Sequence, residues 1–196
     1  MTLYYLHGFA SSSQSVKAVQ ARSFFAARYP SCSFIAPDLA YTPAEAMAQL
    51  VSLMNIAPPS AIIGSSLGGF LATVMAERYH CRACLINPAV APHEVLADFL
   101  GDYYHPVLKR HFAVQQHHMA LLQQLMPVRL AQPANYLVLL QSGDEVLDYR
   151  KAVSYYRGAR LQVTEGGDHS FIGFADYLPA IAEFCQLAPP ASPGSQ

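Results

Sequence analysis

The first residues that could do chemistry form the pentapeptide Gly64-Ser65-Ser66-Leu67-Gly68, which follows a short apolar run and precedes a helical pattern. In a G-x-S-x-G motif between a strand and a helix, the central serine occupies a strained turn, and its hydroxyl faces solvent. Glycines flank it because a Cβ atom at either position would crowd the turn. Ser65 adjoins Ser66, but only Ser66 lies midway between the glycines, so Ser66 is the candidate nucleophile.

A serine hydroxyl needs a base within hydrogen-bond reach, and the base needs an acid that fixes its tautomer. The candidate base is His169, which follows two glycines, and the candidate acid is Asp144. Glu145 and Asp148 are alternatives for the acid, but Asp144 lies closest to the end of a predicted strand. Asp168 precedes His169 directly and is expected to order its own loop, because adjacent side chains rarely reach the required geometry.

Acyl transfer also needs two N–H donors for the oxyanion that forms on the substrate. One is expected to be the backbone N–H of Leu67, the residue after the candidate nucleophile. The second is expected from the loop that follows the first predicted strand, with Phe9 preferred and Ala10 as the alternative. His7 precedes this loop and is interpreted as shaping it rather than as catalytic.

Elements that could position these residues alternate along most of the chain. Strands are predicted over residues 2–6, 33–36, 61–65, 83–86, 136–141 and 161–164. Helices are predicted over 14–29, from 43 to the proline pair at 58–59, from the pentapeptide to 79, over 149–156 and over 172–187. This pattern predicts a parallel sheet with helices on both faces, whose ligands bind at the carboxyl ends of the strands. The residues that come just after predicted strands include His7, Ser66, Asn87, Asp144 and His169.

Two helices carry more detailed expectations. In the segment 14–29, Val16, Val19, Phe24 and Ala27 fit one helical face, with the serines at 11–13 as the cap. The segment Thr42-Pro43-Ala44-Glu45 reads as a capping box, with proline at the first helical position.

Residues 92–132 interrupt the alternation with helical patterns and no predicted strand. This insert is interpreted as a helical lid over Ser66, and most of its apolar residues are expected in the core. It also contains four histidines, His105, His111, His117 and His118. No compact or carboxylate-rich ligand pattern accompanies them, so no metal site is predicted.

Composition limits the remaining possibilities. The chain has 196 residues and a net charge of −1, and 13% of its residues are charged. This predicts one domain over 1–187, a disordered tail over 188–196, and neither nucleic-acid nor anionic-membrane partners. The high apolar fraction is compatible with an oligomer as well as with a monomer. No signal peptide or run of about 20 apolar residues is present, so a cytoplasmic location is expected.

Four cysteines occur, and Cys81 and Cys84 form a C-x-x-C pair. Redox pairs of this type usually open a helix, whereas this pair begins a predicted strand. Ordinary buried thiols are therefore expected rather than a redox or zinc site.

The motifs around Gly8, Ser66, Asp144 and His169 resemble those of the α/β-hydrolase superfamily, which has the same chain order of serine, acid and histidine. More narrowly, nearly the whole chain is similar to small bacterial YqiA/YcfP-type esterases. The resemblance implies a Ser66–Asp144–His169 triad without a cofactor. It also implies activity on short acyl esters, with long-chain acyl-CoA thioesters as a further class. The chain begins directly at the strand before His7, so a trimmed fold with an altered sheet edge is expected.

These observations predict a serine esterase or thioesterase whose partner is a small acyl ester or thioester. An acyl-binding protein with the same fold, or an acyltransferase with little hydrolysis, is the alternative. The triad itself argues against a pure binding role, since binding needs no activated nucleophile. Acyl length, leaving group and the residues that bind substrate are not specified by the sequence.

Overall fold

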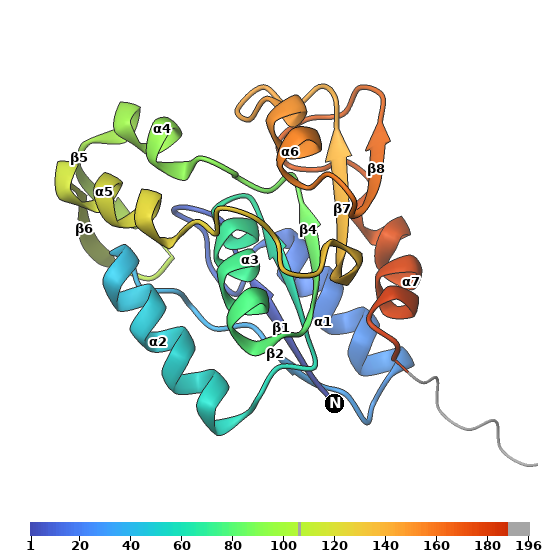
Figure 1. The fold of residues 1–196 in the computed structure, drawn as a ribbon. Coiled ribbons are helices and arrows are strands. Elements are labelled where there is room, and N and C mark those ends of the chain that lie inside the picture. The colour runs from blue at the N-terminus through green and yellow to red at the C-terminus, as the bar shows by residue number, and fades with distance from the viewer. Residues whose placement is uncertain (106, 188–196) are drawn as a thin grey trace, which may run out of the picture.

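A parallel sheet of six strands forms the centre of the computed structural model, which describes residues 1–105 and 107–187 (Figure 1). Its strands are β1 (Thr2–Leu6), β2 (Ser33–Ile35), β3 (Ala61–Ser65), β4 (Arg82–Ile86), β7 (Tyr136–Gln141) and β8 (Arg160–Thr164). All six predicted strands are confirmed, and the sheet order is β2-β1-β3-β4-β7-β8. The chain therefore moves outward from β1 to β2 and returns to β3 on the other side of β1. This reversal opens a crevice at the carboxyl ends of β1 and β3, where ligands bind in sheets of this kind.

Helices cover both faces of the sheet, as predicted. They are α1 (Val16–Arg28), α2 (Pro43–Ile56), α3 (Leu67–Tyr79), α6 (Tyr149–Tyr155) and α7 (Phe174–Phe184). On one face, α2, α3 and α6 bury side chains in the same core cluster as Tyr4 and Leu6 of β1. On the other face, α1 and α7 pack against Leu3 and Tyr5. Successive strand residues thus enter opposite cores, which explains why these strands are apolar throughout.

The capping box of α2 is confirmed, whereas two expectations for α1 are wrong. Thr42 accepts the backbone N–H of Glu45 at 3.3 Å and donates its hydroxyl to that carboxylate at 2.7 Å. Helix α1 instead begins after Ser15, which makes no side-chain cap hydrogen bond. Its buried face is Ala18, Ala21 and Phe25, while Val16 is 72% exposed. Two alanines allow α1 to approach the sheet closely beside Phe25, whereas Val16 and Val19 lie outside the contact.

The expectation of an insert without strands is also wrong. Residues 92–132 contain the helices α4 (Pro92–Leu96) and α5 (Gln116–Leu125), a single helical turn at Ala97–Phe99, and an antiparallel hairpin. The hairpin pairs β5 (Gly101–His105) with β6 (Arg110–Val114). Tyr103 lies directly opposite Phe112, and their rings stack with centroids 5.4 Å apart. Cross-strand aromatic pairs of this kind stabilise a two-stranded ribbon.

The insert lies beside α2 and above the carboxyl ends of the strands, at the left of Figure 1. A second helical turn, Pro133–Asn135, leads from it into β7. In the part of the chain that the structure describes, no helix is long and apolar enough to cross a bilayer. The tail predicted as disordered, 188–196, lies outside the described residues.

Candidate active site

Ser66 occupies the strained turn that its motif predicted. Its backbone angles are φ 56° and ψ −122°, a conformation that non-glycine residues rarely adopt. Gly64 and Gly68 permit the turn. A Cβ on Gly64 would lie 2.6 Å from Cβ of Ala72, and one on Gly68 would overlap the carbonyl groups of Leu6 and His7. The neighbouring elements thus fix the serine in place instead of allowing the strain to relax.

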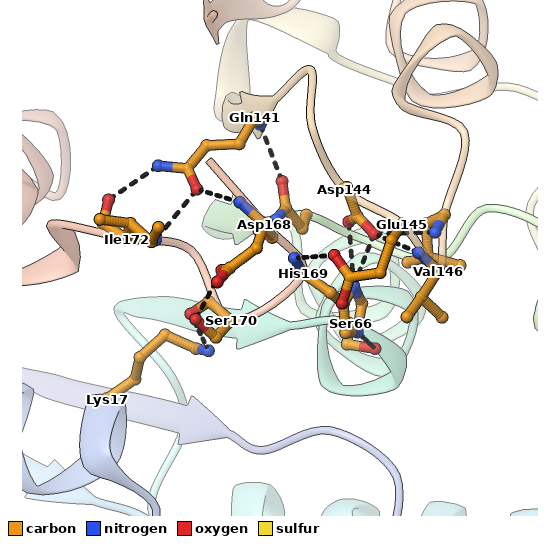
Figure 2. Close-up of polar contacts among 12 residues, drawn as sticks. Lys17, Ser66, Gln141, Asp144, Glu145, Val146, Asp168, His169, Ser170 and Ile172 are labelled. Carbon is orange, nitrogen blue, oxygen red and sulfur yellow. Dashed lines mark hydrogen bonds and ion pairs between the residues drawn. The ribbon is translucent and has the colours of Figure 1, made fainter. Parts of the chain in front are cut away.

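The structure brings Ser66, His169 and Asp144 together in one hydrogen-bonded chain (Figure 2). Oγ of Ser66 lies 3.0 Å from Nε2 of His169. Both carboxylate oxygens of Asp144 face Nδ1 of His169, at 3.0 and 2.9 Å. The side chain of Asp144 is 2% exposed and that of His169 is 23% exposed, so the acid is shielded while the base reaches the cavity.

The contacts define which nitrogen of His169 carries the proton. An ionised carboxylate only accepts hydrogen bonds, so Nδ1 donates to Asp144. Nε2 then presents a lone pair to the Ser66 hydroxyl, which is the arrangement that a general base requires. Asp144 is held in turn by the backbone N–H groups of Val146 and Leu147, which donate to its Oδ1 at 2.9 and 2.8 Å.

Each alternative carboxylate has another role. Glu145 accepts the backbone N–H of His169 at 2.9 Å and so holds the loop rather than the ring. Asp148 is the N-cap of α6, where it accepts the N–H of Arg150 at 3.0 Å. Asp168 accepts the hydroxyl of Ser170 at 2.5 Å, in keeping with the expected ordering of its own loop. Among the described carboxylates, only Asp144 contacts the imidazole of His169.

Two buried amides support the loop that carries His169, and sequence reasoning missed one of them. Oε1 of Gln141 accepts the backbone N–H groups of Asp168 and Ile172 at 3.1 and 2.9 Å. Nδ2 of Asn87 donates to the carbonyl of Asp168 at 3.0 Å. Asn87 was expected at this edge because it follows a strand. Gln141 is the last residue of β7. A polar residue at the end of an otherwise apolar strand was the sequence signal that could have indicated its role.

The loop after β1 approaches the serine closely enough to supply an oxyanion donor. A Cβ on Gly8 would lie 3.2 Å from Cβ of Ser66 and would crowd the serine, so glycine favours this approach. In residues 1–105 and 107–187, the backbone N–H groups of Phe9 and Leu67 make no hydrogen bond to the protein. Both residues line the cavity that contains Ser66. The two expected donors are therefore available, and their role remains a proposal.

His7 holds this loop in a way that matches its expected structural role. Its Nε2 accepts the backbone N–H of Leu39 at 3.0 Å, and its Nδ1 lies 2.9 Å from the carbonyl oxygen of Gly8. Burial lowers the pKa of His7, which favours the neutral ring that these contacts require.

A cavity of about 320 Å³ opens on Ser66 and His169. Its walls come from the loop after β1, the start of α1, the turn at Ser66, and the insert. The insert contributes three residues of α4, Pro92, Val95 and Leu96, and Phe99 of the helical turn that follows. A smaller apolar cavity of about 40 Å³ adjoins the first one and shares Phe9, Leu67 and Leu96 with it. The insert thus contributes walls to both cavities but no residue of the hydrogen-bonded chain.

All four cysteines are free, and Cys81 and Cys84 are buried, as expected. Within the described ranges, no three His, Cys, Asp or Glu side chains come together as a metal site. His105 instead hydrogen-bonds to the carbonyl oxygen of Ser11, far away in the sequence, and accepts the backbone N–H of Leu108, while His118 accepts the backbone N–H of Gln115.

Comparisons with known proteins agree with the fold. The model of an uncharacterised protein family, UPF0227, matches residues 2–186. A crystal structure from Agrobacterium vitis S4, described as a candidate hydrolase, superposes with a TM-score of 0.71 and 16% identity over 94% of this chain and 87% of the other. Est1E from Butyrivibrio proteoclasticus with bound ferulic acid superposes with a TM-score of 0.69 and 15% sequence identity, over 94% of this chain and 88% of the other. The esterase domain of a Rhodothermus marinus protein superposes with a TM-score of 0.69 and 18% sequence identity, over 94% of this chain and 86% of the other. The fold is therefore that of the α/β-hydrolases.

Proposed function

Since the chain belongs to the uncharacterised family UPF0227 and has the α/β-hydrolase fold, we propose that it is a serine hydrolase that cleaves carboxylic esters or acyl thioesters through an acyl-enzyme. The observation that carries the proposal is the 3.0 Å contact between Oγ of Ser66 and Nε2 of His169, whose Nδ1 is held by Asp144. A binding protein has no need of a nucleophile, base and acid in series on a strained turn.

In the first half of the reaction, Oγ of Ser66 attacks the acyl carbon while its proton passes to Nε2 of His169. The carbonyl electron pair moves to oxygen, and the N–H groups of Phe9 and Leu67 stabilise the negative charge. When the carbonyl re-forms, the bond to the leaving group breaks, and His169 gives its proton to the departing alcohol or thiol. Asp144 stabilises the imidazolium throughout.

In the second half, water replaces the leaving group. His169 removes a proton from the water as its oxygen attacks the acyl carbon, and the carbonyl electrons again move to the oxyanion donors. Collapse of this intermediate breaks the bond to Oγ, and His169 returns its proton to Ser66. The products are a carboxylic acid and the free enzyme, and no redox step or cofactor enters the balance.

Labelling by a fluorophosphonate probe tests the assignment, because such probes phosphonylate activated serines. We expect the wild-type protein and Ser65→Ala to be labelled, and Ser66→Ala to remain unlabelled. Hydrolysis of a chain-length series of 4-nitrophenyl esters and acyl thioesters should be lost in Ser66→Ala. Equal labelling of Ser66→Ala and wild type would show that another residue is the nucleophile. Labelling without turnover of any substrate would favour the binding protein.

A further inference from the structure

The proposed reaction leaves one charged group in the active-site cavity without a function, the ammonium of Lys17. Lys17 lies in the first turn of α1 and lines the same cavity as Ser66 and His169. Its Nζ donates to the carbonyl oxygen of Ser170 at 2.7 Å. Figure 2 shows the side chain reaching from α1 toward Ser170, on the side of His169 away from Asp144. An ammonium group has three N–H donors, so this contact leaves two of them for a ligand.

The charge of Lys17 is not neutralised by an ion pair in the described part of the chain. The residues that line the cavity include neither aspartate nor glutamate. Asp168 and Asp144 are the acidic groups that act on Lys17, and both carboxylates already accept other hydrogen bonds, from Ser170 and from His169. Burial lowers the pKa of Lys17, and these two carboxylates oppose that shift.

The position of Lys17 in its helix adds to this electrostatic imbalance. The first turn of α1 contains no acidic residue, and its N-cap makes no side-chain hydrogen bond. A cation at this end of a helix is unfavourable, because the helix dipole is already positive there. An anion bound in the cavity would pair with the positive charge of Lys17. It would also interact favourably with the positive end of the helix dipole.

The location also indicates which part of a substrate carries the anion. His169 must return a proton to the leaving group, so the leaving alcohol or thiol lies on the His169 side of Ser66. Lys17 binds the carbonyl of the residue that follows His169, and therefore lies on that side as well. We propose that Lys17 is a specificity-determining residue that binds an anionic group, a phosphate or a carboxylate, on the leaving alcohol or thiol. This inference rests on the proposed function and narrows its substrate class.

A matched pair of thioesters tests the inference. S-butyryl-3-mercaptopropionate and S-butyryl-3-mercaptopropionamide share an acyl group and differ in the charge of the leaving thiol. We expect kcat/KM of the wild-type protein to favour the anionic compound by roughly fivefold to tenfold, the size of a charge-assisted hydrogen bond at a partly exposed site. The preference should fall in 0.5 M salt, because screening weakens it.

In Lys17→Met, the ratio of the two kcat/KM values should fall to about one, whereas Lys17→Arg should keep most of the preference. Loss of the Ser170 contact alone would slow both substrates equally and leave the ratio unchanged. Lys151→Met is the matched control, because it also removes a positive charge. Lys151 pairs with Glu94 at 2.6 Å on the exposed surface. The ratio of the two kcat/KM values in Lys151→Met should equal that of the wild type.

Two results overturn the inference and leave the proposed function intact: a wild-type ratio near one, or an unchanged preference in Lys17→Met. The first needs only the wild-type protein, so the test does not depend on how well a variant folds. Failure to hydrolyse either compound, or hydrolysis that persists in Ser66→Ala, contradicts the proposed function itself.

Discussion

Oδ1 of Asn87 accepts the backbone N–H of Gln141 at 3.0 Å, so two buried amides lie in series beneath the loop that carries His169. Gln141 then binds the backbone on both sides of His169, through Asp168 and Ile172. The position of the imidazole therefore depends on hydrogen bonds that originate at the ends of two central strands, β4 and β7. Neither amide touches the reacting atoms, so both are positioning residues.

Gln141→Leu should reduce kcat about 10- to 100-fold with a smaller effect on KM, because a displaced His169 no longer aligns with Ser66. The free energy of unfolding should fall by about 2–4 kcal/mol, since two backbone N–H groups lose their buried acceptor. Steady-state kinetics and denaturant unfolding measure the two effects. Gln141→Glu keeps an acceptor and should recover part of kcat. Gln162→Leu, on the exposed part of β8, should leave both quantities near wild type. An unchanged kcat in Gln141→Leu would contradict the positioning role.

Asp144→Asn and Asp148→Asn distinguish the two carboxylates that the sequence left open. Asp144→Asn should lower kcat by on the order of 1,000- to 10,000-fold, because an amide can present the wrong hydrogen-bonding partner to Nδ1 of His169. Asp148→Asn should keep activity, and its stability should change by less than about 0.5 kcal/mol, since asparagine also caps helices well. Ester hydrolysis and thermal unfolding measure these outcomes. The reverse order of activities would assign the acid to Asp148.

Gly68→Ala should destabilise the fold by about 3 kcal/mol or more, because the added Cβ would overlap the carbonyl groups of Leu6 and His7. Gly166→Ala is the comparison. A Cβ there meets open space, and only its positive φ of 73° is unfavourable, so the loss should be about 1 kcal/mol. Urea unfolding midpoints of both variants measure the difference. Equal losses would show that close approach at Gly68 does not limit stability.

The thiols should be inert in the native protein. Burial raises the pKa of Cys81 to about 12, and it also raises the pKa values of Cys84 and Cys32. The thiolate is the reactive form of cysteine. At pH 8 we therefore expect a disulfide reagent such as DTNB to modify at most one thiol rapidly, that of the partly exposed Cys32. All four thiols should react after unfolding in guanidinium. Rapid reaction of more than one thiol in the native state would contradict this prediction and point to local opening around the buried cysteines.

The strands and the hydrogen-bonded chain of Ser66, Asp144 and His169 were predictable because each leaves a short-range signal. An apolar run of four to six residues ended by glycine, proline or a polar residue marks a buried strand. The carboxyl ends of parallel strands then gather Ser66, Asp144 and His169 at one edge without any knowledge of side-chain contacts. The choice between Asp144 and Glu145 followed from distance to the strand end, and the contacts support it.

Other features depend on contacts that a single sequence does not display. The face of α1 was misjudged because Ala18 and Ala21 are buried by close approach, whereas hydrophobicity favours Val16 and Val19. The hairpin in the insert depends on Tyr103 facing Phe112 and on Phe112 stacking against Tyr41, a residue about seventy positions away in a separate loop. The role of Gln141 depends on the path of the distant loop that carries His169, whose backbone N–H groups at Asp168 and Ile172 reach the Gln141 side chain.

Strand β2 gives the six-stranded sheet a short open edge on one side. It has three residues, and Phe34 packs beneath it against Phe25 of α1, with ring centroids 5.7 Å apart. A second chain that added to this edge would find only a few backbone groups to pair with, and long unpaired edges are what promote intermolecular sheets. At this edge, the shortness of β2 therefore limits the backbone groups onto which a second copy of the chain could add a strand.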